Sequence, residues 1–189
     1  MEKVEPIRKI SDIKKIKQIL KNKNMRDYLL FVLGINTGLR ISDLLKLKYE
    51  HIVLRSKIKS NIIIKETKTG KIKQFPITSS ANEAIREYLD YINNEYKYTD
   101  YIFLNKTTNK PITRVQAYRI INNVARQSGI ECQIGTHTLR KTFGYHFYKQ
   151  YKDVALLQEV FNHSSPSITL RYIGINQDNI NKAYRNFSL

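Results

Sequence analysis

The length, composition and charge of the chain favour a single folded domain with a polyanionic partner. At 189 residues it can bury a sizeable core, and its 41% of hydrophobic residues is typical of a globular protein and excludes a disordered one. Lys and Arg outnumber Asp and Glu by 33 to 16, and the resulting net charge of +17 favours nucleic acid as the partner. A basic surface that is merely solvated is the plainer alternative.

Cysteine content and hydropathy indicate the compartment. The single cysteine, Cys132, excludes an internal disulfide and fits a reducing environment. No run of the sequence is long and apolar enough to cross a membrane, and the first ten residues, MEKVEPIRKI, lack the apolar core of a signal peptide. We therefore expect a cytoplasmic protein with no membrane partner.

Helices are predicted at the start of the chain. Ser11 suits an N-cap before isoleucines at helical spacing. A second, largely buried helix is expected over residues 25–35, and Gly38 suits a left-handed C-cap after it. Arg40 then lies in the turn before a short helix over residues 42–47. Such a turn can hold a side chain firmly and still leave it exposed to a ligand.

The pattern changes to strands in the next segment. Residues 51–54, 61–64 and 71–77 read as three short strands, and the turn over residues 67–70 makes the last two a hairpin. Four lysines cluster on this hairpin, so we expect it to reach towards a phosphate backbone. The alternative is an edge strand that lysines protect from aggregation. These lysines are Lys65, Lys68, Lys71 and Lys73.

Helical periodicity returns in the second half. An amphipathic helix is predicted over residues 79–94, and residues 101–104 form a short buried segment. A further helix runs from its N-cap Thr113 to Gly129, and its apolar residues are Val115, Tyr118, Ile120, Ile121 and Val124. Helices, a small antiparallel sheet and more helices predict a mainly α domain with the sheet on one edge, an α+β class.

The stretch 136–174 carries the residues best suited to chemistry. His137 and Arg140 are spaced to share one face of a helix, and His163 follows an amphipathic run. Tyr172 comes after a Ser-Ser-Pro turn and one short helical turn. Each residue alone is more often structural, but two histidines, an arginine and a tyrosine together suit a phosphate site with a phenol nucleophile.

These motifs resemble the tyrosine recombinase (phage integrase) family. HTLRKT and NHSSPSITLRY resemble its C-terminal signature, and TGLRISDLLKL, with Arg40 and Asp43, resembles its first arginine motif. KETKTGKIKQFPI resembles the hairpin that carries its lysine, and Lys68 matches best because it opens the KTG turn. The family usually has Leu-Gly before the second histidine, where this chain has Phe161 and Asn162. The resemblance covers about residues 21–174 and implies the integrase catalytic-domain fold.

The resemblance implies a site-specific DNA recombinase, of integrase or invertase type. Arg40 and Arg140 would hold the scissile phosphate, because guanidinium groups match phosphate oxygens and stay charged. Tyr172 would attack phosphorus, giving a 3′-phosphotyrosyl link and a free 5′-hydroxyl. The exchange of esters stores the bond energy on the enzyme, so strands are resealed without ATP.

The remaining family positions would move protons or orient their neighbours. Lys68 would protonate the leaving 5′ oxygen, and His137 would act as the base on the phenol. His163 would donate a hydrogen bond to the phosphate. Asp43 would orient its neighbours. We expect five further side chains to contact DNA: Lys65, Lys71, Lys73, Lys141 and Arg171.

Other chemistries fit the sequence less well. Metal-dependent nucleases hold their ions with carboxylates, and the acidic residues here are scattered. His137 and His163 lack a third zinc ligand at suitable spacing, and TKTGK lacks the spacing of a P-loop. We therefore expect no metal and no cofactor. Two alternatives stay open: a non-catalytic DNA-binding regulator that keeps the fold, and an enzyme like type IB topoisomerases.

The resemblance also implies assembly on double-stranded DNA. We expect one catalytic domain over residues 1–189 without a core-binding domain, as in the short family members encoded by bacteria, phages and mobile elements. Self-assembly into dimers or tetramers and accessory DNA-binding proteins follow as expected partners. A tail helix is predicted over residues 176–189, and we expect it to dock on a neighbouring protomer. The alternative is that this helix folds back on its own domain. Its apolar stripe is Ile180, Ala183, Tyr184 and Phe187.

Overall fold

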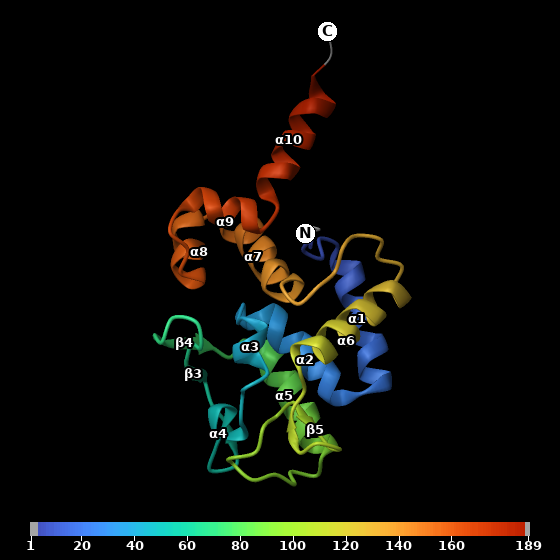
Figure 1. The fold of residues 1–189 in the computed structure, drawn as a ribbon, viewed down its shortest axis with the longest axis vertical. Coiled ribbons are helices and arrows are strands. Elements are labelled where there is room, and N and C mark those ends of the chain that lie inside the picture. The colour runs from blue at the N-terminus through green and yellow to red at the C-terminus, as the bar shows by residue number, and fades with distance from the viewer. Residues whose placement is uncertain (1–3, 188–189) are drawn as a thin grey trace.

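The computed structural model describes residues 4–187 as a mostly helical molecule with short antiparallel hairpins (Figure 1). The mainly α class is confirmed, but the described strands form three separate two-stranded sheets rather than one. The helices are α1 Ile10–Lys23, α2 Met25–Thr37, α3 Ile41–Leu44, α4 Tyr49–Ile52, α5 Ser79–Tyr91, α6 Arg114–Gln127, α7 Thr138–Tyr151, α8 Val154–Phe161, α9 Pro166–Tyr172 and α10 Ile175–Asn186. The strands are β1 Val53–Leu54, β2 Lys57–Ile58, β3 Asn61–Lys65, β4 Ile72–Pro76, β5 Leu104–Asn105 and β6 Lys110–Pro111.

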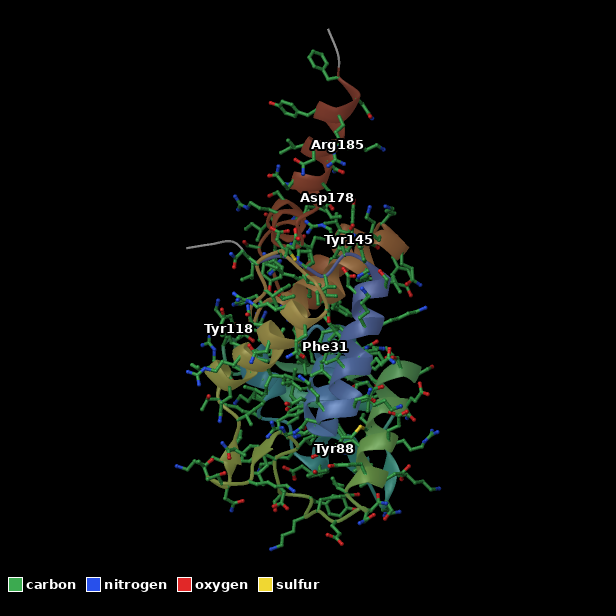
Figure 2. The ribbon with its side chains drawn as sticks, turned by 90° about the vertical axis from the view of Figure 1, so that its right-hand side faces the viewer. Phe31, Tyr88, Tyr118, Tyr145, Asp178 and Arg185 are labelled. Carbon is green, nitrogen blue, oxygen red and sulfur yellow. The ribbon has the colours of Figure 1, made fainter. Side chains whose placement is uncertain are left out.

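Helix α2 lies at the centre of the main core. It packs against α1, α5 and α7, and its side chains are apolar on all faces, as a surrounded helix requires. Phe31 lies in its middle, deep in the molecule (Figure 2). The side chain of Asn24 caps its start by accepting from the backbone N–H of Asp27. Gly38 ends it in the left-handed conformation at φ 63°, as predicted, and this turn sets the position of Arg40.

Helix α7 joins the main core to a smaller one. Its Leu139 belongs to the main core, while Tyr145 belongs to a cluster built from α7, α8, α9 and the start of α10. Gly144 allows the close approach in this cluster, because a Cβ there would lie 2.7 Å from atoms of both Phe161 and Ile173. The two cores meet along α7, and the pair His137 and Arg140, predicted for phosphate binding, lies at its start.

The predicted hairpin is present as β3 and β4. Ile62 pairs with Phe75 and Lys65 with Ile72, so the register follows the burial of one face. The backbone N–H of Gly70 donates to the carbonyl of Glu66 and closes the turn, with Gly70 at φ +67°. Glycine adopts this φ without strain, so the turn that presents Lys68 is well defined.

Two predicted starts of elements were wrong. The first helix begins before Ser11, because the carbonyl of Lys9 already accepts from the N–H groups of Asp12 and Ile13. The strand expected from His51 to Leu54 is helical up to Ile52. The His51 ring accepts from the backbone N–H of Lys48 and so favours the helical turn of α4.

Short hairpins were also missed, and the buried face of one helix was predicted only in part. The pairs β1–β2 and β5–β6 were not predicted, because strands of two residues are too short to show alternation. The helix capped by Thr113 is present, with the hydroxyl accepting from the N–H of Gln116. Ile121 and Val124 are buried as expected, but Val115 and Tyr118 are exposed, because the buried stripe runs through Ala117 and Ile121.

The first described residues lie along α7, and α10 extends beyond the smaller core. Residues 4–8 run along α7, where the N–H of Ile7 donates to Thr142 and the carbonyl of Ile7 contacts His146. Helix α10 projects away from the body, with Asp178 near its base and Arg185 far along it (Figures 1 and 2). Between residues 4 and 187, no helix is both long and apolar enough to cross a membrane.

Candidate active site

The structure brings five predicted residues together from separate elements. Arg40 precedes α3, His137 and Arg140 lie at the start of α7, His163 follows α8, and Tyr172 ends α9 (Figure 1). The Nδ1 atom of His137 lies 3.1 Å from the Tyr172 hydroxyl. The rings of His163 and Tyr172 meet edge to face, with centroids 5.1 Å apart. These contacts place a phenol between two imidazoles.

Arg140 is held by the backbone of two other elements. Its side chain is buried, and it donates to the carbonyl of Gly38 after α2 and, at 2.9 Å, to the carbonyl of Phe161 at the end of α8. The guanidinium also stacks on the Phe161 ring, 4.2 Å from its centroid. Burial lowers the pKa of Arg140 to about 10, which keeps it charged at neutral pH. The charge is therefore fixed in position before any ligand arrives.

Arg40 is held by a carboxylate that the sequence reading did not single out. Its Nη1 lies 2.6 Å from Oε1 of Glu66, and Oε2 of Glu66 accepts from the Thr69 hydroxyl at 2.6 Å. Within residues 4–187 the remaining nitrogens of Arg40 have no hydrogen-bond partner, so they can face a ligand. A signal was available, because Glu66, the first residue after β3, continues the buried alternation of Ile62 and Ile64.

Asp43 contacts the backbone of the same turn. It is 3% exposed, and its Oδ1 accepts from the N–H of Thr67 at 2.9 Å. Its Oδ2 is buried without a hydrogen-bond partner in the described part of the chain. No group of three His, Cys, Asp or Glu side chains in that part converges to hold a metal ion. Asp43 thus contacts the hairpin turn, and its role in orienting its neighbours stays a prediction.

The pair His137 and Tyr172 is arranged for proton transfer. His137 stands at the N-cap of α7 rather than inside the helix, and its ring is partly open to solvent. Partial loss of hydration inside the protein lowers the pKa of His137, and the charges of Lys141 and Arg114 lower it further. Burial raises the pKa of Tyr172 above its usual value, although Arg140 opposes this shift. A neutral imidazole therefore faces a protonated phenol.

His163 is neutral as well. Its Nδ1 lies 3.1 Å from the Thr169 hydroxyl, and burial followed by the charges of Arg140 and Arg40 lowers the pKa of His163 to about 4. The preceding Asn162 ends α8 in the left-handed conformation, at φ 52°. Asparagine tolerates this conformation better than other residues with a Cβ, so the change from the family's usual glycine preserves the turn.

Lys68 is exposed on the hairpin turn. Its ammonium makes no hydrogen bond or ion pair with any residue from 4 to 187. The structure therefore does not draw it into the cluster of the other five residues. Lys65 and Arg171 are likewise exposed, and Lys71 is exposed with its Nζ 3.3 Å from Oδ1 of Asn162.

Two of the lysines expected on DNA have internal partners instead. Lys141 is 6% exposed; its Nζ donates to the carbonyl of Val4 at 2.8 Å and lies over the Tyr172 ring. Lys73 donates to the carbonyl of Val160 at 2.7 Å. The ammonium groups of Lys141 and Lys73 therefore form hydrogen bonds that link separate elements of the protein. This placement argues against the DNA contacts predicted for them.

The chain is similar to named recombinases along most of its length. It matches the Phage integrase family over residues 9–179. Probable integrase/recombinase YoeC of Bacillus subtilis (strain 168) is 48% identical over 187 residues, which cover 99% of this chain and 98% of that protein. The type 1 fimbriae regulatory protein FimE of Escherichia coli (strain K12) is 31% identical over 153 residues, covering 80% and 75%.

Solved structures share the fold at lower identity. The XerA recombinase superimposes with a TM-score of 0.75 at 20% identity, covering 98% of this chain and 65% of that one. A lambda integrase(75-356) dimer bound to a COC' core site gives 0.68 at 20% identity, covering 92% and 61%. The chain therefore spans under two thirds of these structures. By the extent of its match and its likeness to YoeC, the chain belongs to the phage integrase family, the tyrosine recombinases.

Proposed function

We propose that this chain cleaves and rejoins duplex DNA at specific sites through a 3′-phosphotyrosyl intermediate on Tyr172. The observation that carries the proposal is the 3.1 Å approach of the Tyr172 hydroxyl to His137 beside the immobilised guanidinium of Arg140. A nucleophile, its base and a fixed positive charge are the parts that phosphoryl transfer needs. Membership of the recombinase family supports the same reaction.

The proposed cleavage step uses each group once. Arg40 and Arg140 bind the non-bridging oxygens of the scissile phosphate, and His163 donates a hydrogen bond to one of them after it gains a proton. The phenol of Tyr172 transfers its proton to His137 as its oxygen bonds to phosphorus. The bond from phosphorus to the 5′ oxygen breaks, and Lys68 gives that oxygen a proton. Rejoining is the reverse reaction with a 5′-hydroxyl from another strand.

The charge of the chain supports a double-stranded DNA partner. The net charge is +17, and Lys65, Lys68, Lys71 and Arg171 are exposed around the site. Arg and Lys side chains that neutralise phosphates supply sequence-independent affinity. A XerH recombinase with the same fold, at a TM-score of 0.73, was solved on its difH substrate in a post-cleavage complex. We place the activity in the cytoplasm, where chromosomal or phage DNA is accessible.

We further propose that α10 mediates assembly on DNA. Ile180 and Tyr184 are exposed on it by 49% and 78%, and Phe187, which follows its last residue in extended conformation, is 70% exposed. The side chain of Ala183 and residues 188–189 lie outside the described part of the chain. Large apolar side chains on a projecting helix favour docking on a neighbouring protomer over folding back. Residues 4–187 then act as one catalytic unit within a dimer or tetramer, with accessory DNA-binding proteins as further partners.

A trapping experiment tests the proposal. Random duplexes carrying a nick near the cleavage position are incubated with the protein, and covalently bound DNA is recovered after denaturation and sequenced. We expect one sequence family to be enriched, and two such duplexes to exchange strands. Relaxation of supercoiled plasmids without strand exchange would instead indicate a topoisomerase. Specific binding without any covalent complex would indicate a non-catalytic regulator.

A further inference from the structure

Glu66 is a buried carboxylate beside the phosphate site, and the cleavage step above gives it no role. We propose that Glu66 is a positioning residue that couples Arg40 to the turn carrying Lys68, so that both reach the scissile phosphate as one unit. This inference rests on the proposed function and deepens it. It adds a functional residue that lies in the hairpin segment but is not one of the predicted site residues.

The two oxygens of Glu66 hold two different parts of the site. Oε1 lies 2.6 Å from Nη1 of Arg40, which precedes α3, and Oε2 accepts from the hydroxyl of Thr69 in the hairpin turn at 2.6 Å. The contact between Glu66 and Thr69 spans the turn, and Lys68 lies between these two residues in the sequence. Glu66 therefore restrains the turn from its own position and from Thr69, while it also restrains Arg40.

The backbone of the turn is closed around the same residue. The N–H of Glu66 donates to the carbonyl of Lys71, and its carbonyl accepts from the N–H of Gly70, each at 2.9 Å. On the opposite side the N–H of Thr67 donates to Asp43. The turn thus has little freedom at its base, and the Thr69 contact extends this order towards its tip.

The electrostatic cost of this carboxylate argues for a geometric benefit. Glu66 is 1% exposed, and a buried anion beside a phosphate site repels the ligand. Burial alone would raise the pKa of Glu66, but the Thr69 hydrogen bond and the charges of Arg40 and Lys73 outweigh it and hold the pKa below its usual value. A neutral residue here would not repel the phosphate, so we assign the benefit of the carboxylate to the positions of Arg40 and Lys68.

Two isosteric variants separate the two restraints. Glu66→Gln removes the charge that holds Arg40 and weakens the contact with Thr69. Thr69→Val removes the hydroxyl alone and leaves the ion pair with Arg40 in place. Thr67→Val is the matched control, because Thr67 lies in the same turn and its hydroxyl contacts only the exposed Lys46 among the described residues. Lys68→Ala serves as the reference for loss of the proton donor.

Cleavage rates on two substrates test whether Glu66 couples Arg40 to the turn that carries Lys68. One substrate has the ordinary bridging 5′ oxygen at the scissile phosphate, and the other has sulfur in its place. The sulfur leaves as a thiolate and needs no proton, because thiols ionise near pH 8.5. We expect Thr69→Val to slow cleavage of the oxygen substrate at least about tenfold and to be largely rescued on sulfur, as Lys68→Ala is. Glu66→Gln should slow both substrates, because Arg40 is released too. Equal losses for Thr69→Val on both substrates, or wild-type rates for Glu66→Gln, would overturn the inference.

Hydrogen exchange tests the coupling without catalysis. We expect the backbone amides of residues 66–71 to exchange faster in Glu66→Gln and Thr69→Val than in the wild type or in Thr67→Val. Unchanged exchange in both variants means that Glu66 does not order the turn, and the inference fails. If the wild type forms no adduct on either substrate, the proposed function fails, while faster exchange in the two variants still supports the positioning role.

Discussion

At the scale of single residues, the candidate site places two neutral histidines beside fixed positive charges. His163 has a pKa of about 4, caused by burial and then by Arg140 and Arg40, and the pKa of His137 is also lowered. A phosphodiester brings a negative charge to the same place and favours the protonated imidazole. The histidines are therefore prepared to take up a proton when DNA binds and when the phenol is deprotonated.

The pKa of His163 predicts how folding stability depends on pH. In the unfolded chain a histidine takes up a proton near pH 6.5, whereas in the folded protein His163 stays neutral down to about pH 4. The free energy of unfolding therefore has its full value above pH 6.5 as far as His163 is concerned. It decreases as the pH falls from 6.5 to about 4, because the unfolded state binds the extra proton. Urea unfolding of the wild type and of His163→Gln at several pH values should show a weaker pH dependence in the variant. Parallel curves would refute the assignment.

Most residues of the candidate site were predictable because each lies in a short, recognisable motif. Arg40, Arg140 and Tyr172 fall in such segments, and the structure brings them together. Glu66 was missed because its partner Arg40 is 26 residues away, although strand alternation placed it on the buried face. The tie between Lys141 and Val4 spans 137 residues, and no local pattern reveals such a contact.

At the scale of secondary structure, the approach of α7 to α8 and α9 holds the tyrosine in place. Gly144 makes this approach possible, since any side chain there would meet Phe161 and Ile173. Leu157 and Ile175 complete this smaller core. The position of Tyr172 thus depends on packing between helices as well as on its own contacts.

Gly144→Ala should destabilise the protein by about 1–3 kcal/mol through overpacking. This loss should occur although alanine favours a helix over glycine by about 0.5–1 kcal/mol. Urea unfolding measures it, with Asn123→Ala on the exposed face of α6 as the control for helix propensity alone. A variant that is as stable as the wild type would mean that α7 and α8 can separate without cost.

Long helices were predictable from apolar periodicity, and short elements were not. The first helix, with Ile13, Ile16 and Leu20 buried, and the amphipathic helix Ser79–Tyr91 follow the periodic pattern closely. Strands of two residues carry no period, and the helical turn at His51 depends on a contact between the side chain and the backbone of Lys48. Local sequence therefore predicts elements that bury a regular face, and misses those that depend on a single contact.

At the scale of the whole molecule, charge should dominate DNA binding. A net charge of +17 implies several phosphate contacts, and log affinity should fall with log salt by about 0.9 per contact. Titrations from low to high salt measure the slope. Lys71→Gln should reduce it by about one contact, whereas Lys97→Gln, in the loop after α5, should leave it unchanged. An affinity that does not depend on salt would contradict the electrostatic account.

The exposed apolar stripe of the projecting helix α10 should matter for assembly and not for folding. A stripe of a few hundred Å² contributes roughly several kcal/mol at about 25 cal/mol/Å², against an association cost of roughly 4–15 kcal/mol. The free protein should therefore be a monomer or associate weakly, and DNA should supply the effective concentration. The double variant Ile180→Ser, Tyr184→Ser should bind a half-site normally and lose cooperativity on a full site in gel-shift titrations. Undiminished cooperativity would mean that the stripe has no partner on DNA.

The central claim is that Tyr172 forms the covalent link to DNA. Nicked substrates that trap the intermediate allow the adduct to be digested and the modified peptide to be identified by mass spectrometry. The account predicts one phosphotyrosyl peptide containing Tyr172, and a Tyr172→Phe variant that binds DNA as the wild type does but forms no adduct. An adduct on Tyr145, Tyr148 or Tyr151, or one that survives Tyr172→Phe, would contradict it.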